Sequence, residues 1–425
     1  QYFTMNLKTK LFSILAPITF LSVPLSAQIY ADVAISQGTN SLGTIRITLE
    51  HVKAPRQTAN FIGLATGRRP WISPTSGKVM IDTPYYDGQI FHRLDHDFVI
   101  QGGDRTGTGS GGPGYVVQDE YEPTLRHDGR YILSSAKSSL PNTAGSQFFI
   151  TLEAASALDD KHSIFGKVTG GQNIIDSFTD PVQFPTDANE RPLTPITMDS
   201  VTISGPDYIT FDIDNPALGL PHVKGVTPVI DFDYATNSVL IKYPRLAQHN
   251  YISYTSLDLQ TWNKYAHSLS INDDAAHVLT IPNVTVPKFF FSHAAIDYSH
   301  IYNPPADLLA SGSTFTFSNA SGDTVTLVSD GAGAGTWTDS DGGSGALTAF
   351  TLTDSTPATG NFISGGEQAQ FIPLTTLNVE FSDAAGAGDW VTLSGRLSFH
   401  SSTNGGLEGG ANGNTAVNQP FTFTP

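Results

Sequence analysis

Four short segments in the first half of the chain combine residue types that can act on a polypeptide. In order they are Phe91-His92-Arg93, Phe98–Asp104, Gly145–Ile150 and Asp159–Val168. They hold an arginine, two glutamines, two histidines and several aromatic side chains. A guanidinium presents its N–H donors in a fixed fork, and beside apolar side chains it can donate hydrogen bonds inside a hollow. The segments are therefore candidates for one site.

The order and spacing of these segments closely resemble the signature of the cyclophilin family. The agreement runs from about Gly43 to Ile203, so it covers only the first part of the chain. One such segment would be a weak signal, whereas four in the right order are a strong one. The resemblance implies peptidyl-prolyl cis/trans isomerase activity with no cofactor and no metal, with proline-containing polypeptides as partners.

The chemistry of that reaction explains the arginine. Rotation about an X–Pro bond crosses a barrier of about 18–20 kcal/mol that comes from amide resonance. The twisted imide nitrogen regains a lone pair, and a donor placed there stabilises the transition state more than either ground state. The resemblance gives this role to Arg93, which can also hold the carbonyl before the proline.

The resemblance also assigns the rest of the site. Phe98, Val99, Phe149, Leu158 and His162 would surround the proline ring, with Gln101 and Gln147 near the peptide backbone. We assign catalysis to Arg93, Phe98, Gln101, Phe149 and His162, and substrate contact to His92, Val99, Ala136, Lys137, Gln147 and Leu158. Without the motifs, ordinary barrel core would be the better interpretation of the apolar members, and a structural hydrogen bond that of His162.

Three positions depart from the family pattern. Ala157 stands where the family often has a tryptophan that matters for cyclosporin, so the resemblance does not extend to cyclosporin binding. The segment Ser134–Asn142 has one residue more than the common form and carries Lys137 in place of the usual Asn, which predicts a different groove rim. The loop Thr106–Tyr115 is short and looks bacterial.

The elements that must position this site are predicted to be mainly β. Thr44–Leu49 alternates like a strand with one buried face. Ala54–Gly67 has helical spacing, with Pro55 in the first turn and Gly67 as a cap, and Gln172–Phe178 is a second helix. Between them lie short apolar runs cut by glycines. The pattern predicts a closed antiparallel barrel of eight strands, capped by the two helices, over residues 28–204.

Two further all-β, sandwich-like modules are predicted. In residues 205–303, strands are expected at Val229–Tyr234, Ser238–Tyr243, Tyr251–Thr255 and His277–Ile281. Pro304-Pro305 forms a stiff linker. Residues 306–425 are acidic and rich in Gly, Ser and Thr, with apolar residues at near-even spacing from Phe315 to Phe399. Disorder is the competing interpretation for Gly405–Asn414.

Composition excludes several classes of partner and site. The net charge of −17 argues against nucleic acid or an anionic membrane surface. The absence of cysteine excludes disulfides, thiolate metal sites and a cysteine nucleophile.

The first residues predict export to the periplasm or the exterior. Met5 is expected to be the initiator. Lys8 and Lys10 precede the apolar run Leu11–Leu21, and Ala27 offers a cleavage site before Gln28. Residues 1–27 are therefore interpreted as a signal peptide. The apolar run is shorter than the roughly 20 residues that span a bilayer, so no transmembrane segment is expected in the mature chain.

Other patterns in the chain do not support a site. Gly107–Gly112 fits GxGxxG, but Pro113 follows at once, so no helix is expected to begin there. His92, Asp95, His96 and Asp97 are interpreted as solvated loop charges rather than as metal ligands. Asp339–Gly343 lacks the further ligands of a calcium loop.

A second function class stays open. More than half of the mature chain lies outside the catalytic block, so the cyclophilin-like groove could capture proline segments while the β modules attach the protein to a surface or matrix. In that case Arg93→Ala would leave peptide affinity nearly intact.

Overall fold

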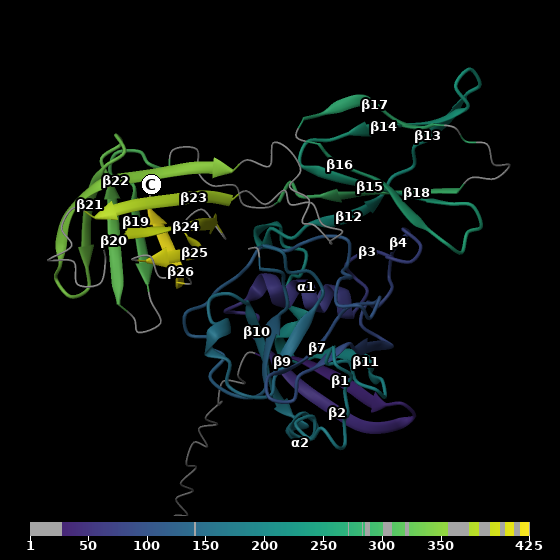
Figure 1. The fold of residues 1–425 in the computed structure, drawn as a ribbon, viewed down its shortest axis with the longest axis horizontal. Helices are drawn as coiled ribbons and strands as arrows, with labels where there is room; N and C mark the ends of the chain where they lie inside the picture. The colour runs from purple at the N-terminus through teal and green to yellow at the C-terminus, as the bar shows by residue number, and fades with distance from the viewer. Residues whose placement is uncertain are drawn as a thin grey trace, which may run out of the picture.

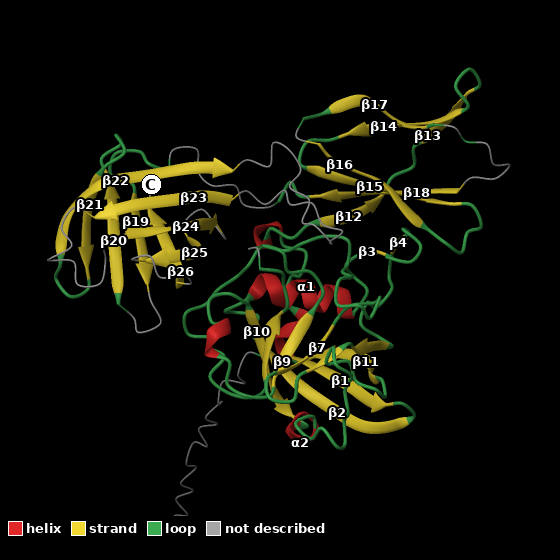
Figure 2. Ribbon diagram, in the orientation of Figure 1, coloured by secondary structure: helices red, strands yellow, loops and turns green. Residues whose placement is uncertain are grey.

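The computed structural model describes residues 28–139, 142–270, 272–282, 284, 290–300, 308–318, 323–355, 374–381, 392–399, 404–411 and 417–424. The predicted signal peptide and the predicted Pro304-Pro305 linker lie outside these residues. The described chain is mainly β with few helices (Figure 2). Within it, no helix combines the length and the apolar character needed to cross a bilayer.

Residues 28–204 form a nearly closed antiparallel barrel (Figure 1). Its sheet has nine strands in the order β5-β11-β1-β2-β10-β8-β9-β7-β6. The strands are β1 Ile29–Gln37, β2 Asn40–Leu49, β5 Gln89–Phe91, β6 Arg93–Leu94, β7 Val99–Gly102, β8 Ile132–Ser135, β9 Phe148–Thr151, β10 Ile164–Gly170 and β11 Ile196–Ser204. A two-stranded pair, β3 Trp71–Ile72 and β4 Val79–Met80, lies outside this sheet.

The difference between nine strands and the predicted eight has a local cause. β5 and β6 stand at opposite ends of the sheet order, yet only His92 separates them in the chain. β5 pairs with β11 and β6 pairs with β7. One extended segment therefore changes partner at His92, and this bend brings the two edges of the sheet together.

Alternating burial explains the strands. In β1, Ile29, Ala31, Val33 and Ile35 are all buried, and the residues between them are partly exposed. This period of two is what a strand with one face on a core requires. The predicted strand Thr44–Leu49 is confirmed within β2.

Both predicted helices are present, close to the predicted bounds. α1 spans Pro55–Ala65 and α2 spans Gln172–Ser177, and Figure 1 shows them at opposite ends of the barrel. Pro55 occupies the first turn of α1, and Gly67 has φ +74° just after its end, a conformation that favours glycine. The described residues also contain three short 3₁₀ helices: η1 Ser156–Leu158, η2 Pro206–Ile209 and η3 Pro216–Leu218.

Two sheets form the second module. One has the order β12-β18-β15-β16 and the other β13-β14-β17. Their strands are β12 His222–Gly225, β13 Val229–Asp233, β14 Ser238–Arg245, β15 His249–Ser256, β16 Asn263–Ser270, β17 Asp274–Ile281 and β18 Phe290–Asp297. Ile241 and Ile281 from one sheet share an apolar cluster with Tyr251 and Ala295 from the other, so the sheets pack face to face. The four strands predicted in this region are confirmed.

The second module packs directly on the first. Ile213, Leu220 and Tyr298 belong to the same buried cluster as the barrel residues. The Arg69 guanidinium, 1% exposed, donates to the Pro221 carbonyl at 2.9 Å and to the Ile213 carbonyl at 3.0 Å. The Tyr298 hydroxyl accepts from the Val116 amide. The two modules therefore share one core and buried polar contacts.

The third module is a closed barrel, whereas the sequence predicted a sandwich-like fold. It closes because β19 pairs with both β20 and β26. The strands are β19 Thr314–Ser318, β20 Thr324–Ser329, β21 Gly335–Asp339, β22 Ser344–Ser355, β23 Leu374–Phe381, β24 Thr392–Phe399, β25 Asn404–Ala411 and β26 Val417–Thr424. Leu407 is fully buried in β25, so the disorder considered for Gly405–Asn414 is wrong over the described residues 405–411.

The buried contacts of Arg69 predict a measurable share of stability. Arg69→Met removes two charge-assisted hydrogen bonds and leaves two carbonyls without a donor, which should lower the free energy of unfolding by roughly 3 kcal/mol. Urea unfolding measures the change. Arg68→Met is the matched control, because the Arg68 side chain is 47% exposed and pairs with the exposed Asp214. Loss of this surface pair should cost less than about 1 kcal/mol. Equal decreases in the free energy of unfolding in both variants would show that the buried contacts stabilise the fold no more than the exposed pair does.

Candidate functional site

Strand register places the central residues of the site in one row. Arg93 of β6 lies opposite Gln101 of β7, and Gln101 lies opposite Phe149 of β9. Because side chains alternate between the two faces of a sheet, these three share a face. Their neighbours Ile100 and Ile150 are fully buried in the barrel core. Along these strands, alternate side chains therefore point to the barrel core and to the site.

This row opens on a pocket of about 440 Å³. Ten of the eleven predicted site residues line it: Arg93, Phe98, Val99, Gln101, Ala136, Lys137, Gln147, Phe149, Leu158 and His162. The exception is His92. The lining also includes residues that sequence reasoning did not assign: Gly109, Ser110, Gly111, Gly112, Ser138, Thr143, Gly145 and Ser146. Gly145 and Ser146 belong to the motif that holds Gln147, and Ser138 follows Lys137, so these positions were the available signal. Gly109–Gly112 lie in the glycine-rich loop, which the sequence did not connect with the site.

Acidic and aromatic groups surround Arg93. Its Nε donates to Glu190 Oε2 at 2.5 Å, and its Nη2 lies 3.4 Å from Asp95 Oδ2. The guanidinium carbon is 5.6 Å from the centre of the Phe98 ring, within cation–π range. Nη1 has no hydrogen bond to any described residue. The side chain is 34% exposed, so Nη1 can donate to a bound acceptor.

Two histidines hold Phe149 on the pocket floor. The His127 ring stacks on it at 5.9 Å, and the His162 ring meets it edge-on at 5.4 Å. His162 Nδ1 lies 3.0 Å from the Ser135 carbonyl oxygen, which fixes the proton on that nitrogen. Burial lowers the pKa of His162 to about 4. His162 therefore presents a neutral ring to the pocket.

Gln101 and Gln147 form a chain of amides along one wall. Gln101 Nε2 donates to Gln147 Oε1 at 2.9 Å. Gln147 Nε2 in turn lies 2.9 Å from the carbonyl oxygens of Gly109 and Gly111. The two predicted glutamines thus connect the catalytic strand to the glycine-rich loop.

That loop is built around the carboxylate of Asp104. The carboxylate accepts from the amides of Thr106, Thr108 and Gly109 at 2.7, 3.0 and 2.6 Å. Burial opposes the charge, but these bonds outweigh it and lower the pKa of Asp104. A Cβ on Gly111 would stand 2.1 Å from Asp104 Oδ1, so only glycine fits there. No helix begins in residues 107–112, as the sequence predicted.

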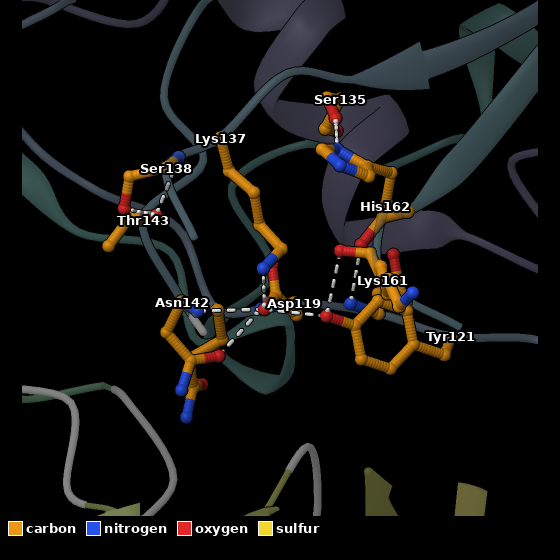
Figure 3. A network of polar contacts seen from close by, with 12 residues as sticks. Asp119, Tyr121, Ser135, Lys137, Ser138, Asn142, Thr143, Lys161 and His162 are labelled. Carbon is orange, nitrogen blue, oxygen red and sulfur yellow. Dashed lines mark hydrogen bonds and ion pairs between the residues drawn. The ribbon is translucent and has the colours of Figure 1, made fainter. Parts of the chain in front are cut away.

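Lys137 lines the pocket, but its ammonium group is paired with Asp119. Nζ lies 3.7 Å from Asp119 Oδ2, and both side chains are at least 98% buried. Figure 3 shows the ammonium directed at Asp119, whose carboxylate also accepts from the Tyr121 hydroxyl and the Asn142 amide. Charge–charge attraction in a buried site explains the orientation. Its ammonium thus supports the groove rim, while substrate contact by the rest of Lys137 stays a prediction.

His92 is the predicted site residue that lies outside the pocket lining. It is buried, with 6% of its surface exposed, and its ring lies against Gly109 behind the pocket wall. Strand bending explains this position, because His92 sits at the break between β5 and β6. It does not line the pocket, so substrate contact by His92 is not supported.

Ala136 and Leu158 occupy the remaining edges. The Ala136 amide donates to the Gln147 carbonyl at 2.9 Å, and Ala136 lines the pocket. Leu158 ends η1, next to the exposed Ala157. Within the described residues, no group of three or more acidic or histidine side chains is arranged to hold a metal ion.

The low pKa of His162 predicts a defined response to acid. Between about pH 6.5 and pH 4, the unfolded chain binds a proton that the folded chain does not, so acidification lowers the free energy of unfolding over this window. NMR should find this imidazole neutral at about pH 5.5. His162→Gln should make the fall in stability between pH 7 and pH 4 less steep. An NMR midpoint near 6.5 for this ring would contradict the expectation.

Known proteins resemble this part of the chain in sequence. The family described as cyclophilin type peptidyl-prolyl cis-trans isomerase/CLD matches residues 33–203. A probable peptidyl-prolyl cis-trans isomerase A of Mycobacterium leprae is 43% identical over 38% of this chain and 87% of its own length. Peptidyl-prolyl cis-trans isomerase B of Streptomyces anulatus is 39% identical over 42% of this chain and 98% of its own. One solved structure is a cyclophilin-type peptidyl-prolyl cis-trans isomerase of Cryptosporidium parvum in the presence of the dipeptide Ala-Pro. It is 30% identical in sequence, and the match covers 42% of this chain and 99% of the solved chain, with a TM-score of 0.35. The chain therefore belongs to the cyclophilin-type peptidyl-prolyl cis-trans isomerases.

Proposed function

We propose that this isomerase acts on X–Pro bonds of exported proteins and assists their folding, with residues 28–204 as the catalytic unit. The observation that carries the catalytic assignment is the row of Arg93, Gln101 and Phe149 across three strands, facing an open pocket. A proline ring is apolar and needs an apolar contact, while the twisted imide needs a donor. The row supplies both within one face of the sheet.

The mechanism follows from these positions. The proline ring packs on Phe149, between Val99 and Leu158. Nη1 and Nη2 of Arg93 hold the carbonyl before the proline and donate to the imide nitrogen as it becomes pyramidal. Gln101, fixed by Gln147, and the carbonyl of Ala136 hold the peptide backbone. No proton or covalent bond is transferred, so the rate gain comes from positioning and from hydrogen bonds that strengthen at the transition state.

Sequence features support the exported context. Lys8 and Lys10, the apolar run Leu11–Leu21 and Ala27 form the pattern of a cleaved signal. We assign residues 205–303 and 306–425 as accessory modules. The net charge of −17 suits a soluble exported protein better than one that binds nucleic acid.

The activity proposal is tested by Arg93→Ala. Loss of the donor should lower kcat/KM for a proline tetrapeptide by about 10²–10³ in a protease-coupled assay, the usual scale for a donor at a transition state. Arg130→Ala is the control, because Arg130 pairs with Glu153 and Asp176 rather than with the pocket. Peptide affinity should be measured in parallel. Wild-type activity no better than buffer, with affinity retained, would favour the binding-module alternative.

The export proposal is tested by the N-terminus of the mature protein. Expression of the full chain in a bacterial host should release a protein that begins near Gln28 into the periplasm or the medium, because Ala27 ends the predicted signal. Mass spectrometry of the fractions measures this. Replacing two leucines of the apolar run by aspartate should keep the uncleaved chain inside the cell. An uncleaved cytoplasmic wild-type chain would refute export.

A further inference from the structure

Two carboxylates from different parts of the chain hold the guanidinium of Arg93. Glu190 comes from the loop between α2 and β11, 97 residues away, and Asp95 follows β6 directly. The Nε–Oε2 distance to Glu190 is 2.5 Å, whereas the Nη2–Oδ2 distance to Asp95 is 3.4 Å. Glu190 therefore makes the dominant contact.

A tight turn presents Glu190 to Arg93. The Asp187 carboxylate accepts from the amides of Asn189 and Arg191 at 2.8 and 2.9 Å. The Glu190 amide donates to the Asp187 carbonyl, and the Glu190 carbonyl accepts from the Leu94 amide at 2.7 Å. Both the backbone and the side chain of Glu190 thus bind the short strand β6 that carries Arg93.

Glu190 adopts an unfavourable backbone conformation in this turn. Its φ is +62°, in the left-handed region that residues other than glycine, Asn and Asp rarely adopt. The conformational cost of this φ angle therefore falls on Glu190, the residue whose side chain binds the Arg93 guanidinium. Strained residues concentrate at functional sites, which is consistent with a role for this side chain rather than for the turn alone.

We propose that Glu190 is a positioning residue, which fixes Arg93 in its catalytic orientation before the peptide binds. An arginine side chain has several flexible torsions, and ordering it at the transition state would cost entropy. By binding Nε, Glu190 removes this freedom and leaves Nη1 without a partner among the described residues. Asp95 supports the same orientation through Nη2. The inference rests on Arg93 being the donor in isomerisation.

An ordinary surface ion pair is the competing explanation, and the two make different predictions. Arg93 is 34% exposed and Glu190 is 44% exposed, so the pair should contribute little to stability. A positioning role instead predicts a loss of kcat with an unchanged melting temperature. The KM for a proline peptide should change little, because the apolar contacts of the proline ring remain.

The experiment compares two variants of Glu190 in the full chain. Glu190→Asn suits the left-handed turn but is too short to reach Arg93, and it should lower kcat/KM by about tenfold. Glu190→Gln keeps the size and one acceptor oxygen without the charge, and it should retain more activity than Glu190→Asn. Glu153→Gln is the matched control, because Glu153 is also about half exposed and pairs with an arginine away from the pocket. It should behave as wild type.

A double-mutant cycle separates this inference from the activity proposal. In an Arg93→Ala background, Glu190→Asn should cause no further loss, because Glu190 acts only through Arg93. An equal fractional loss of kcat/KM in both backgrounds would overturn the inference. A wild-type kcat/KM in Glu190→Asn would also overturn it. So would a drop in melting temperature large enough to explain the lost activity of both Glu190 variants. An inactive wild-type protein, by contrast, would refute the activity proposal itself.

Discussion

The pairing register of β6, β7, β9 and β8 is the constraint on which the site depends. It aligns Arg93, Gln101, Phe149 and Ser134 across four strands. Because side chains alternate with a period of two, a slip of one residue would exchange these groups with core residues such as Ile150. Burial of the core face opposes that slip, so the hydrophobic effect that folds the barrel also fixes the geometry of the donor and the apolar floor.

Much of this arrangement could be predicted from the sequence, because local patterns encode it. The helix at Pro55–Ala65 and four strands of the second module follow from residue spacing. Ten pocket residues follow from the family resemblance that the ordered motifs carry. What could not be predicted depends on distant contacts. Glu190 meets Arg93 only through a left-handed turn, Lys137 turns toward Asp119 only because that carboxylate is buried, and the last module closes only because its first and last strands pair.

The change of composition near residue 205 marks a module but not an independent body. Tyr298 of the second module accepts from the Val116 amide, and the next residue, Val117, pairs with Ala144 beside the pocket-lining Gly145. Two contacts, joined through neighbouring residues of the chain, thus link the second module to one wall of the pocket. The buried Arg69 joins the two parts on another side. The second module therefore contributes to the support of the groove as well as to its own core.

The glycine-rich wall of the pocket consists of main chain, and this limits how the site can change. Gly109 and Gly111 present carbonyl oxygens that Gln147 binds, and Gly111 has no space for a larger residue because Asp104 stands against it. A compound that rests on this wall would meet a surface that point substitutions cannot easily reshape. Resistance to such an inhibitor would have to arise on the side-chain edges of the groove, at Leu158, Ser138 or Thr143.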